Sequence, residues 1–173
     1  MDPLLPPTSA EGRYGVAVAR FHDDVTSSLL DGARAAFADA GVGPDRLEVV
    51  EVPGAFELPF ACRLLSGRPG VEAVVALGCV VRGETPHFDF VAGECCRGIM
   101  ELNLRGPVPV VLGVLTTETK AQALHRASRE ALRDSAEVKH ADRAPGASNK
   151  GWEAARTALA MAALRAPAAG GGR

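Results

Sequence analysis

The segment from Arg82 to His87 holds the richest group of chemically useful residues in the chain. Thr85 can cap the start of a helix, and Pro86 fits the first helical position, where its missing N–H costs nothing. The free amides around Glu84 and Thr85 then face outward at the positive end of the helix, which suits a phosphate. His87 follows in the first turn, where the helix dipole favours a neutral imidazole that accepts and returns a proton. A helix start whose histidine only packs or faces water is the alternative.

A second group of candidate residues runs from Pro53 to Glu57. Gly54 allows a ligand to approach the backbone, whose N–H and C=O groups could read the edge of a heterocycle. Glu57 could accept hydrogen bonds from ligand hydroxyls, or it could serve only as an acid in the first turn of a helix. Phe21 could stack on a planar ring if it is exposed, or it could pack in the core.

Two cationic side chains, Arg126 and Lys150, stand late in the sequence. A phosphate ligand favours a guanidinium, whose planar fork matches the phosphate oxygens. Solvated surface charge is the alternative for both residues, because most Arg and Lys side chains lie at the surface.

Strand-like and helix-like segments alternate along the chain and must position these residues. Strands are expected at residues 14–20, 47–52, 73–81 and 108–115, and helices at 25–40, 57–66, 86–104, 118–131 and 150–164. Asp23 or Asp24 is expected to cap the first helix, and Gly41 to end it. This alternation predicts an α/β fold with a parallel sheet between two helix layers. Ligands of such sheets bind beyond the carboxyl ends of the strands, where the loops described above lie.

Composition excludes several classes of protein. The 173 residues are 47% hydrophobic, which suits a single domain with a real core. Lys and Arg total 19 against 21 Asp and Glu, so the basic excess of a nucleic-acid binder is missing. No apolar run reaches the roughly 18 residues of a membrane span, and the N-terminal segment has no apolar signal core.

Missing motifs exclude further classes of protein. The four cysteines include no Cys-x-x-Cys pair, and the four histidines lack metal-ligand spacing, so we expect no metal and buried free thiols in a reducing, cytoplasmic compartment. No dinucleotide fingerprint, Walker A loop or Gly-x-Ser-x-Gly elbow occurs. Nicotinamide dehydrogenases, P-loop kinases, GTPases and α/β-hydrolases are therefore disfavoured.

Taken together, these motifs resemble the 6,7-dimethyl-8-ribityllumazine synthase family. The matching stretches are residues 19–21, 52–59, 77–91, 113–117 and 149–155, which occur in the family's order and span about 13–165. The block Arg-Gly-Glu-Thr-Pro-His-Phe-Asp at 82–89 is the most specific of them. The resemblance implies a three-layer α/β/α, flavodoxin-like domain with a four-stranded parallel sheet. Residues 1–12 and 166–173 are expected to be flexible.

The resemblance also implies a reaction of riboflavin biosynthesis that needs no cofactor. The amine of 5-amino-6-ribitylaminouracil condenses with the ketone of 3,4-dihydroxy-2-butanone 4-phosphate to an imine. Phosphate is then eliminated, and the ring closes with loss of water. Two alternatives remain open at this point: a non-catalytic relative that binds a lumazine or flavin or acts as a scaffold, and another flavodoxin-like enzyme acting on sugar phosphates.

Individual roles follow from the same resemblance. Phe21 stacks on the pyrimidine, Gly54, Ala55, Phe56 and Glu57 bind the ring edge and the ribityl chain, and Val80 and Val81 offer backbone groups. Glu84 and Thr85 hold phosphate through their amides, and His87 moves protons. Arg126 clamps the phosphate, and Lys150 supports the ribityl or carboxylate side of the pocket. In this family the last two residues reach the site from a neighbouring subunit, which implies a homo-oligomer, expected to be a pentamer, with intersubunit sites.

Two features depart from the family pattern. Leu112 stands where many relatives carry Phe, so it would wall the pocket without stacking on the pyrimidine. Residues 128–148 form a long, charged insertion between the last two helices, where shell-forming relatives have a tight kink. We therefore expect a pentamer, single or paired, that does not close into a sixty-subunit shell.

Overall fold

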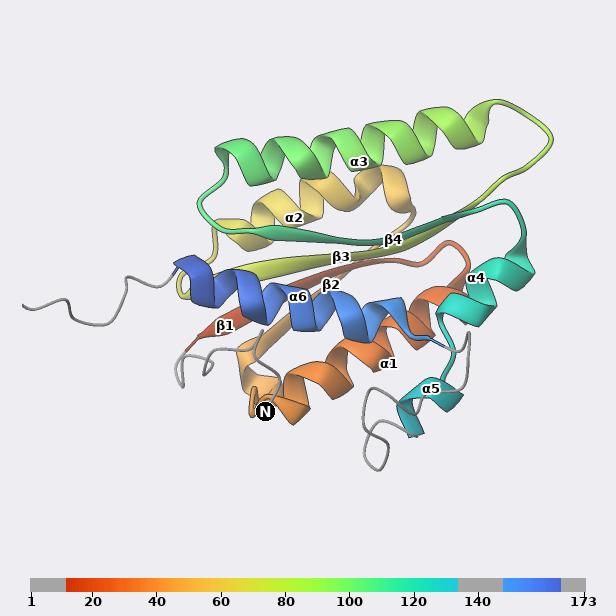
Figure 1. Cartoon of the computed structure of the whole chain (residues 1–173). Coiled ribbons are helices and arrows are strands. Elements are labelled where there is room, and N and C mark those ends of the chain that lie inside the picture. Colours follow the sequence, from red (N-terminus) through yellow and green to blue (C-terminus); the bar gives the residue numbers. More distant parts are fainter. Residues whose placement is uncertain (1–11, 134–147, 166–173) are drawn as a thin grey trace, which may run out of the picture.

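A four-stranded parallel sheet forms the centre of the protein (Figure 1). The computed structural model describes residues 12–133 and 148–165. The strands are β1 (Arg13–Ala19), β2 (Leu47–Val52), β3 (Val71–Val81) and β4 (Val110–Thr117), arranged in the order β2-β1-β3-β4. The two central strands β1 and β3 are buried on both faces, which accounts for their nearly continuous apolar sequences.

Helices cover both faces of this sheet (Figure 1). One layer holds α1 (Asp23–Asp39), α4 (Lys120–Arg126) and α6 (Lys150–Arg165); the other holds α2 (Leu58–Ser66) and α3 (His87–Arg105). Short helical turns are η1 (Pro44–Arg46), η2 (Ala55–Glu57) and α5 (Glu130–Arg133). The predicted α/β/α, flavodoxin-like fold with a four-stranded parallel sheet is confirmed.

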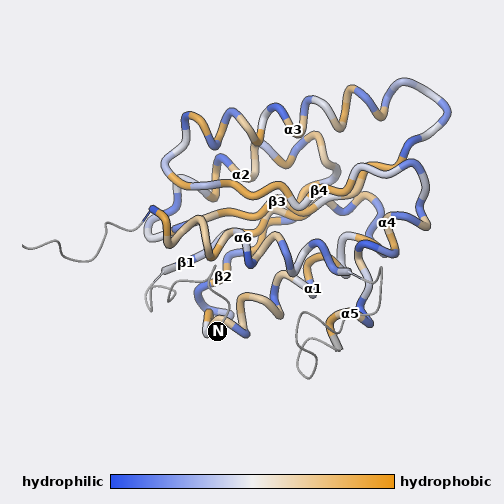
Figure 2. The backbone as a smooth tube through the Cα atoms, viewed as in Figure 1, coloured by the Kyte–Doolittle hydropathy of each residue, from blue (hydrophilic) through white to orange (hydrophobic). Residues whose placement is uncertain are grey.

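Alternation along β1 divides the core into two halves. Tyr14, Val16 and Val18 pack toward α1 and α6, whereas Ala17 and Ala19 pack toward α2 and α3. Successive strand side chains point to opposite faces, so one strand supplies both cores. Figure 2 shows hydrophobic residues concentrated along the strands, while each helix alternates between apolar and polar residues.

The prediction of one helix over residues 118–131 is wrong, because helix α4 ends at Arg126 and a separate short helix, α5, begins at Glu130. Ala127 leaves the helix to form an isolated antiparallel bridge with Asn149. Its carbonyl accepts a hydrogen bond of 2.5 Å from the Ser28 hydroxyl, and Ser128 N–H donates to Ser148 O at 3.0 Å. Backbone groups that a continuing helix would pair within itself therefore form hydrogen bonds with residues distant in the sequence.

Predicted helix starts also need correction. The position before α1 is His22, which has left-handed backbone angles, so neither Asp23 nor Asp24 is the cap. Helix α3 begins at His87 with Pro86 at its cap position, so the predictions of Thr85 as the cap and of Pro86 as the first helical residue are each wrong by one residue. Helix α1 ends before Gly41 as predicted, with Gly41 at φ +79°. The β4 strand begins two residues later than expected, at Val110, whose N–H and carbonyl pair with the side chain of Asn103.

Some expectations fall on residues that the structure does not describe. The expected flexible ends lie outside the described residues, except for Gly12. Of the expected insertion at 128–148, residues 134–147 lie outside them as well.

Helices α1 and α6 pack closely because a glycine lies at their crossing. A Cβ atom on Gly151 would overlap the backbone carbonyl of Leu29, which cannot move out of the way without shifting α1. Close packing of this kind tolerates no added methyl group without strain.

We predict opposite effects of alanine at two helical glycines. Gly151→Ala should lower the free energy of unfolding by about 1–3 kcal/mol through overpacking. Gly93→Ala, on exposed α3 with no neighbouring atom within 4 Å of the new Cβ, should raise it by up to about 1 kcal/mol through helix propensity. Urea unfolding followed by circular dichroism measures both, and equal stabilities for the two variants would contradict this account of the crossing.

Candidate functional site

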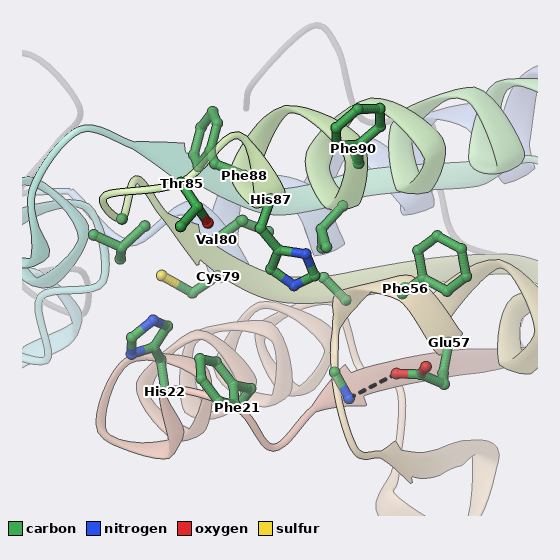
Figure 3. A pocket seen from close by; sticks show the side chains of 15 residues that line it. Phe21, His22, Phe56, Glu57, Cys79, Val80, Thr85, His87, Phe88 and Phe90 are labelled. Carbon is green, nitrogen blue, oxygen red and sulfur yellow. Dashed lines mark hydrogen bonds between the residues drawn. The ribbon is translucent and has the colours of Figure 1, made fainter.

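A hollow of about 570 Å³ opens at the carboxyl ends of the central strands, beside the start of α3 (Figure 3). It is lined by residues from each of the first three predicted loops: Phe21, the range 54–57, Val80 and Val81, and Thr85 with His87. The parallel sheet brings these loops together, because the carboxyl ends of parallel strands meet at one edge.

Phe21 and His22 turn toward this hollow at the end of β1 (Figure 3). Phe21 is 67% exposed, so the alternative of core packing is wrong. Its ring meets the His22 ring edge-on, with centroids 4.8 Å apart. The left-handed turn at His22 (φ 62°) is held by its carbonyl, which accepts hydrogen bonds from the N–H groups of Val25 and Thr26. An exposed phenyl ring at this edge can stack on a planar ligand.

The second loop holds its own carboxylate. The N–H of Gly54 donates to Glu57 Oε2 at 3.0 Å, shown as the dashed line in Figure 3. Glu57 therefore acts as a capping acid for the turn, while its exposed side chain also lines the hollow. The Gly54 N–H is paired within the turn, but Gly54 lines the hollow, so its role in binding the edge of a heterocycle stays a prediction. Phe56 is 59% exposed at the rim, and Ala55 is buried beneath it.

The third loop brings the end of β3 and a histidine to the same place. Val80 and Val81 end β3 inside the hollow, and Gly83 and Thr85 line it further along. Glu84 lies between the last two but is not among the lining residues. His87 is the first residue of α3, and its imidazole projects into the space between α3 and Phe21 (Figure 3).

A second hollow of about 440 Å³ runs along the open edge of β4, between α4 and α6. The remaining predicted residues, Leu112, Arg126 and Lys150, all line it. Leu112 is 47% exposed, and the Lys150 Nζ lies 2.7 Å from Glu153 Oε2. In the described part of the chain the two hollows share no lining residue, so the predicted site is divided between two separate surfaces.

Asn149 brings the two cations of the second hollow together. Its side chain is buried, and its Oδ1 accepts from the N–H groups of Gly151 and Trp152 at 3.0 and 3.1 Å. The backbone of Asn149 pairs with Ala127. Arg126 and Lys150 are the neighbours of these paired residues in the sequence, so the bridge sets both side chains in one hollow.

Several lining residues were not predicted: His22, Cys79, Gly83, Phe88, Phe90 and Val91 in the first hollow. Phe88, Phe90 and Val91 follow His87 within one helical turn, a spacing that could have indicated them. The left-handed turn at His22 was not predicted, because the conformation is uncommon outside glycine, although histidine adopts it more often than most residues do.

Cys79 lines the first hollow as a protonated thiol. Burial, and to a lesser degree the nearby Asp24 carboxylate, raises its pKa to about 11. Cys62 and Cys95 are buried as expected, and burial raises the pKa of each to about 12, whereas Cys96 is half-buried. At neutral pH these groups are poor nucleophiles, because the thiolate is the reactive form.

Two features are missing from residues 12–133 and 148–165. No cluster of three His, Cys, Asp or Glu side chains is placed to hold a metal ion. None of the helices described there combines the length and apolarity needed to cross a membrane.

The fold and the first hollow define a flavodoxin-like α/β protein with its site at the carboxyl edge of the sheet. Comparison with known proteins gives its family: the sequence profile of 6,7-dimethyl-8-ribityllumazine synthase matches residues 11–166. The chain belongs to this family, and the resemblance inferred from the motifs is confirmed.

Individual relatives support the same family assignment. The chain is 44% identical over 162 residues to the 6,7-dimethyl-8-ribityllumazine synthase of Thermus thermophilus, covering 93% of each chain. It is 42% identical over 165 residues to that of Syntrophus aciditrophicus, covering 91% of this chain and 97% of the relative. For Porphyromonas gingivalis the values are 44% over 158 residues, with 91% and 88% covered.

Proposed function

We propose that this protein condenses 5-amino-6-ribitylaminouracil with 3,4-dihydroxy-2-butanone 4-phosphate to 6,7-dimethyl-8-ribityllumazine, releasing phosphate and water. Membership in the family supports this reaction. The observation that links the reaction to particular residues is the first hollow, which gathers an exposed phenyl ring, the end of β3 and a histidine at a helix start.

Each part of the hollow suits one part of the reactants. The Phe21 ring can stack on the pyrimidine while the ends of β3 at Val80 and Val81 offer backbone groups to its edge. The amides from Gly83 to Thr85 lie before α3, whose positive end favours a phosphate. His87, beside them, can accept the proton of the attacking amine and return it to a leaving oxygen. Holding two reactants in one site accounts for much of such catalysis without a cofactor.

The site is completed by a second copy of the chain. Among the described lining residues of the first hollow no Lys or Arg occurs, although a phosphate ligand favours a cation. The second hollow has Arg126 and Lys150, and the open edge of β4 beside it. A contact between two different surfaces of one chain is head-to-tail, and it closes into a ring when the rotation permits. The family resemblance favours a ring of five.

Apolar rims on both hollows support the same contact. Phe56 and Phe90 are 59% and 68% exposed at the first hollow, and Leu112 is exposed at the second. Exposed apolar groups of this size gathered at one place mark surfaces that other proteins cover.

We predict that His87→Ala slows turnover far more than the control His125→Ala. The His87 variant should lower kcat by about 10²- to 10⁴-fold, the usual contribution of acid–base catalysis. His125 is exposed and lies in neither hollow, so its variant should retain wild-type kcat. The assay follows absorbance of the lumazine product and release of inorganic phosphate from both substrates. Wild-type protein that binds the pyrimidine without forming product would indicate the non-catalytic alternative.

We predict that two impaired variants complement each other. His87→Ala disables the first hollow, and Arg126→Ala should weaken the second by raising the KM for the phosphate substrate. When the two variants are co-expressed in equal amounts, about one quarter of head-to-tail contacts pair two intact hollows. Activity at limiting phosphate substrate should rise well above the mean of the separate variants. A simple average would place the whole site within one chain.

We predict a particle of five or ten chains rather than a shell. The segment at 128–148 lies where shell-forming relatives have a tight kink, and it adds length and charge there. Static light scattering should give a mass of five or ten times the 18.0 kDa chain. A megadalton particle would refute the proposal that the insertion prevents shell closure.

A further inference from the structure

Arg82 stands directly after β3, at the entrance of the loop whose amides we assign to phosphate. It is the only Lys or Arg between residues 69 and 96. The loop and the first turn of α3 also carry the carboxylates of Glu84 and Asp89. A lone arginine in this position could bind the phosphate directly, or it could act on the loop, and its contacts distinguish the two.

The guanidinium of Arg82 is held by three groups at once. Its NH2 lies 3.0 Å from Asp89 Oδ1, and its NH1 donates to the other oxygen of Asp89 at 3.4 Å. Its Nε lies 2.9 Å from a carboxylate oxygen of Glu118. Its Cζ lies 4.1 Å from the centre of the Phe88 ring. The Arg82 N–H also donates to Thr117 O at 2.9 Å.

These partners belong to the segments that surround the loop. Phe88 and Asp89 form the first turn of α3, and Glu118 follows β4. Arg82 therefore ties the end of β3 to the start of α3 and to the end of β4, and the loop between residues 82 and 87 must span these anchored points. Three of the five guanidinium donors face carboxylates, and Arg82 is not a lining residue of the first hollow. Direct binding of phosphate is thus disfavoured.

A single exposed ion pair contributes little to stability, but Arg82 contacts two carboxylates and an aromatic ring at once. The forked contact with Asp89, the second carboxylate and the aromatic face each restrict the guanidinium in a different direction. Arg82 is 38% exposed, less than Asp89 at 60% or Glu118 at 63%. A lysine would keep the charge, but an ammonium cannot serve two carboxylates and stack on a ring together.

We propose that Arg82 is a positioning residue for the phosphate: it holds the amides from Gly83 to Thr85 in their binding geometry without touching the substrate. This rests on the proposed function, since it needs a phosphate at those amides. It differs from a general charge effect, in which only the sum of charges near the phosphate matters.

Two variants of the assembled protein test the role of Arg82. Arg82→Lys keeps the charge and should raise the Ki of inorganic phosphate and the KM of the butanone phosphate by about three- to tenfold, as loss of a helix-terminus interaction would. The KM of the pyrimidine substrate should stay unchanged. Glu118→Gln removes a negative charge near the phosphate and should nevertheless weaken phosphate binding, because one anchor of Arg82 is lost.

The matched control is Arg97→Lys. Arg97 also pairs with two carboxylates, Glu94 at 2.6 Å and Glu101 at 2.5 Å, but all three lie on α3 away from the loop. This variant should leave every constant at its wild-type value. Melting temperatures of all three variants show whether each is folded; if Arg82→Lys does not fold, Glu118→Gln decides the question by the sign of its effect.

Contrary outcomes are distinct. Unchanged phosphate constants in Arg82→Lys, an equal rise in both KM values, or tighter phosphate binding in Glu118→Gln would each overturn the role of Arg82. Calorimetry with inorganic phosphate separates this from the reaction itself. A wild-type protein that binds phosphate but forms no lumazine would overturn the proposed reaction, while the phosphate affinities of the variants would still decide the role of Arg82.

Discussion

One buried amide, the side chain of Asn149, holds the second half of the site together. Asn149 is 2% exposed, and its Nδ2 donates to Ser28 O at 3.0 Å while its Oδ1 accepts from the first turn of α6. It therefore joins α1, the chain after α4 and the start of α6 in one place. A buried amide left without hydrogen bonds would lower the stability of the fold by more than one of its hydrogen bonds contributes. The groups that pair with Asn149 must therefore all be in place together. The glycine two residues later lets α6 approach α1 closely enough for this to occur.

The first hollow depends on the carboxyl ends of the strands. Parallel strands deliver the ends of β1, β2 and β3 to one place, and the first hollow is built there from short loops on rigid strands. The open edge of β4 carries the second hollow, which ends in two cations. This division explains why the hollow that holds the exposed Phe21 ring and His87 has no Lys or Arg among its described lining residues.

Most of the fold could be predicted from sequence, because its signals are local. Continuous runs of apolar residues indicated the strands, and apolar residues at every third or fourth position indicated the helices. A glycine marked the end of α1. The break after Arg126 could not be predicted, because Ala127 leaves the helix for a partner 22 residues away. The His22 turn was not predicted, because its carbonyl is held by N–H groups of the helix that follows and histidine adopts the left-handed conformation only occasionally.

The candidate site was predicted best where backbone geometry decides and worst where side chains pair. Phe21, Val80, Thr85 and His87 line one hollow because strand ends place them there. Glu57 accepts a hydrogen bond from the Gly54 N–H, since the carboxylate and the amide are three residues apart in a tight turn, and this pairing was not predicted. Pairing of this kind depends on rotamers, which a sequence pattern does not specify.

The bridge between Ala127 and Asn149 has a consequence for how this protein can change over evolution. It fixes the two ends of the intervening chain side by side, so the spacing of the neighbouring cations does not depend on how many residues lie between them. The entropy of closing such a loop grows only slowly with its length, by about 0.6 kcal/mol for each doubling. Insertions and deletions at this point therefore cost little stability, and the outer shape of the molecule can diverge there while the second hollow keeps its geometry.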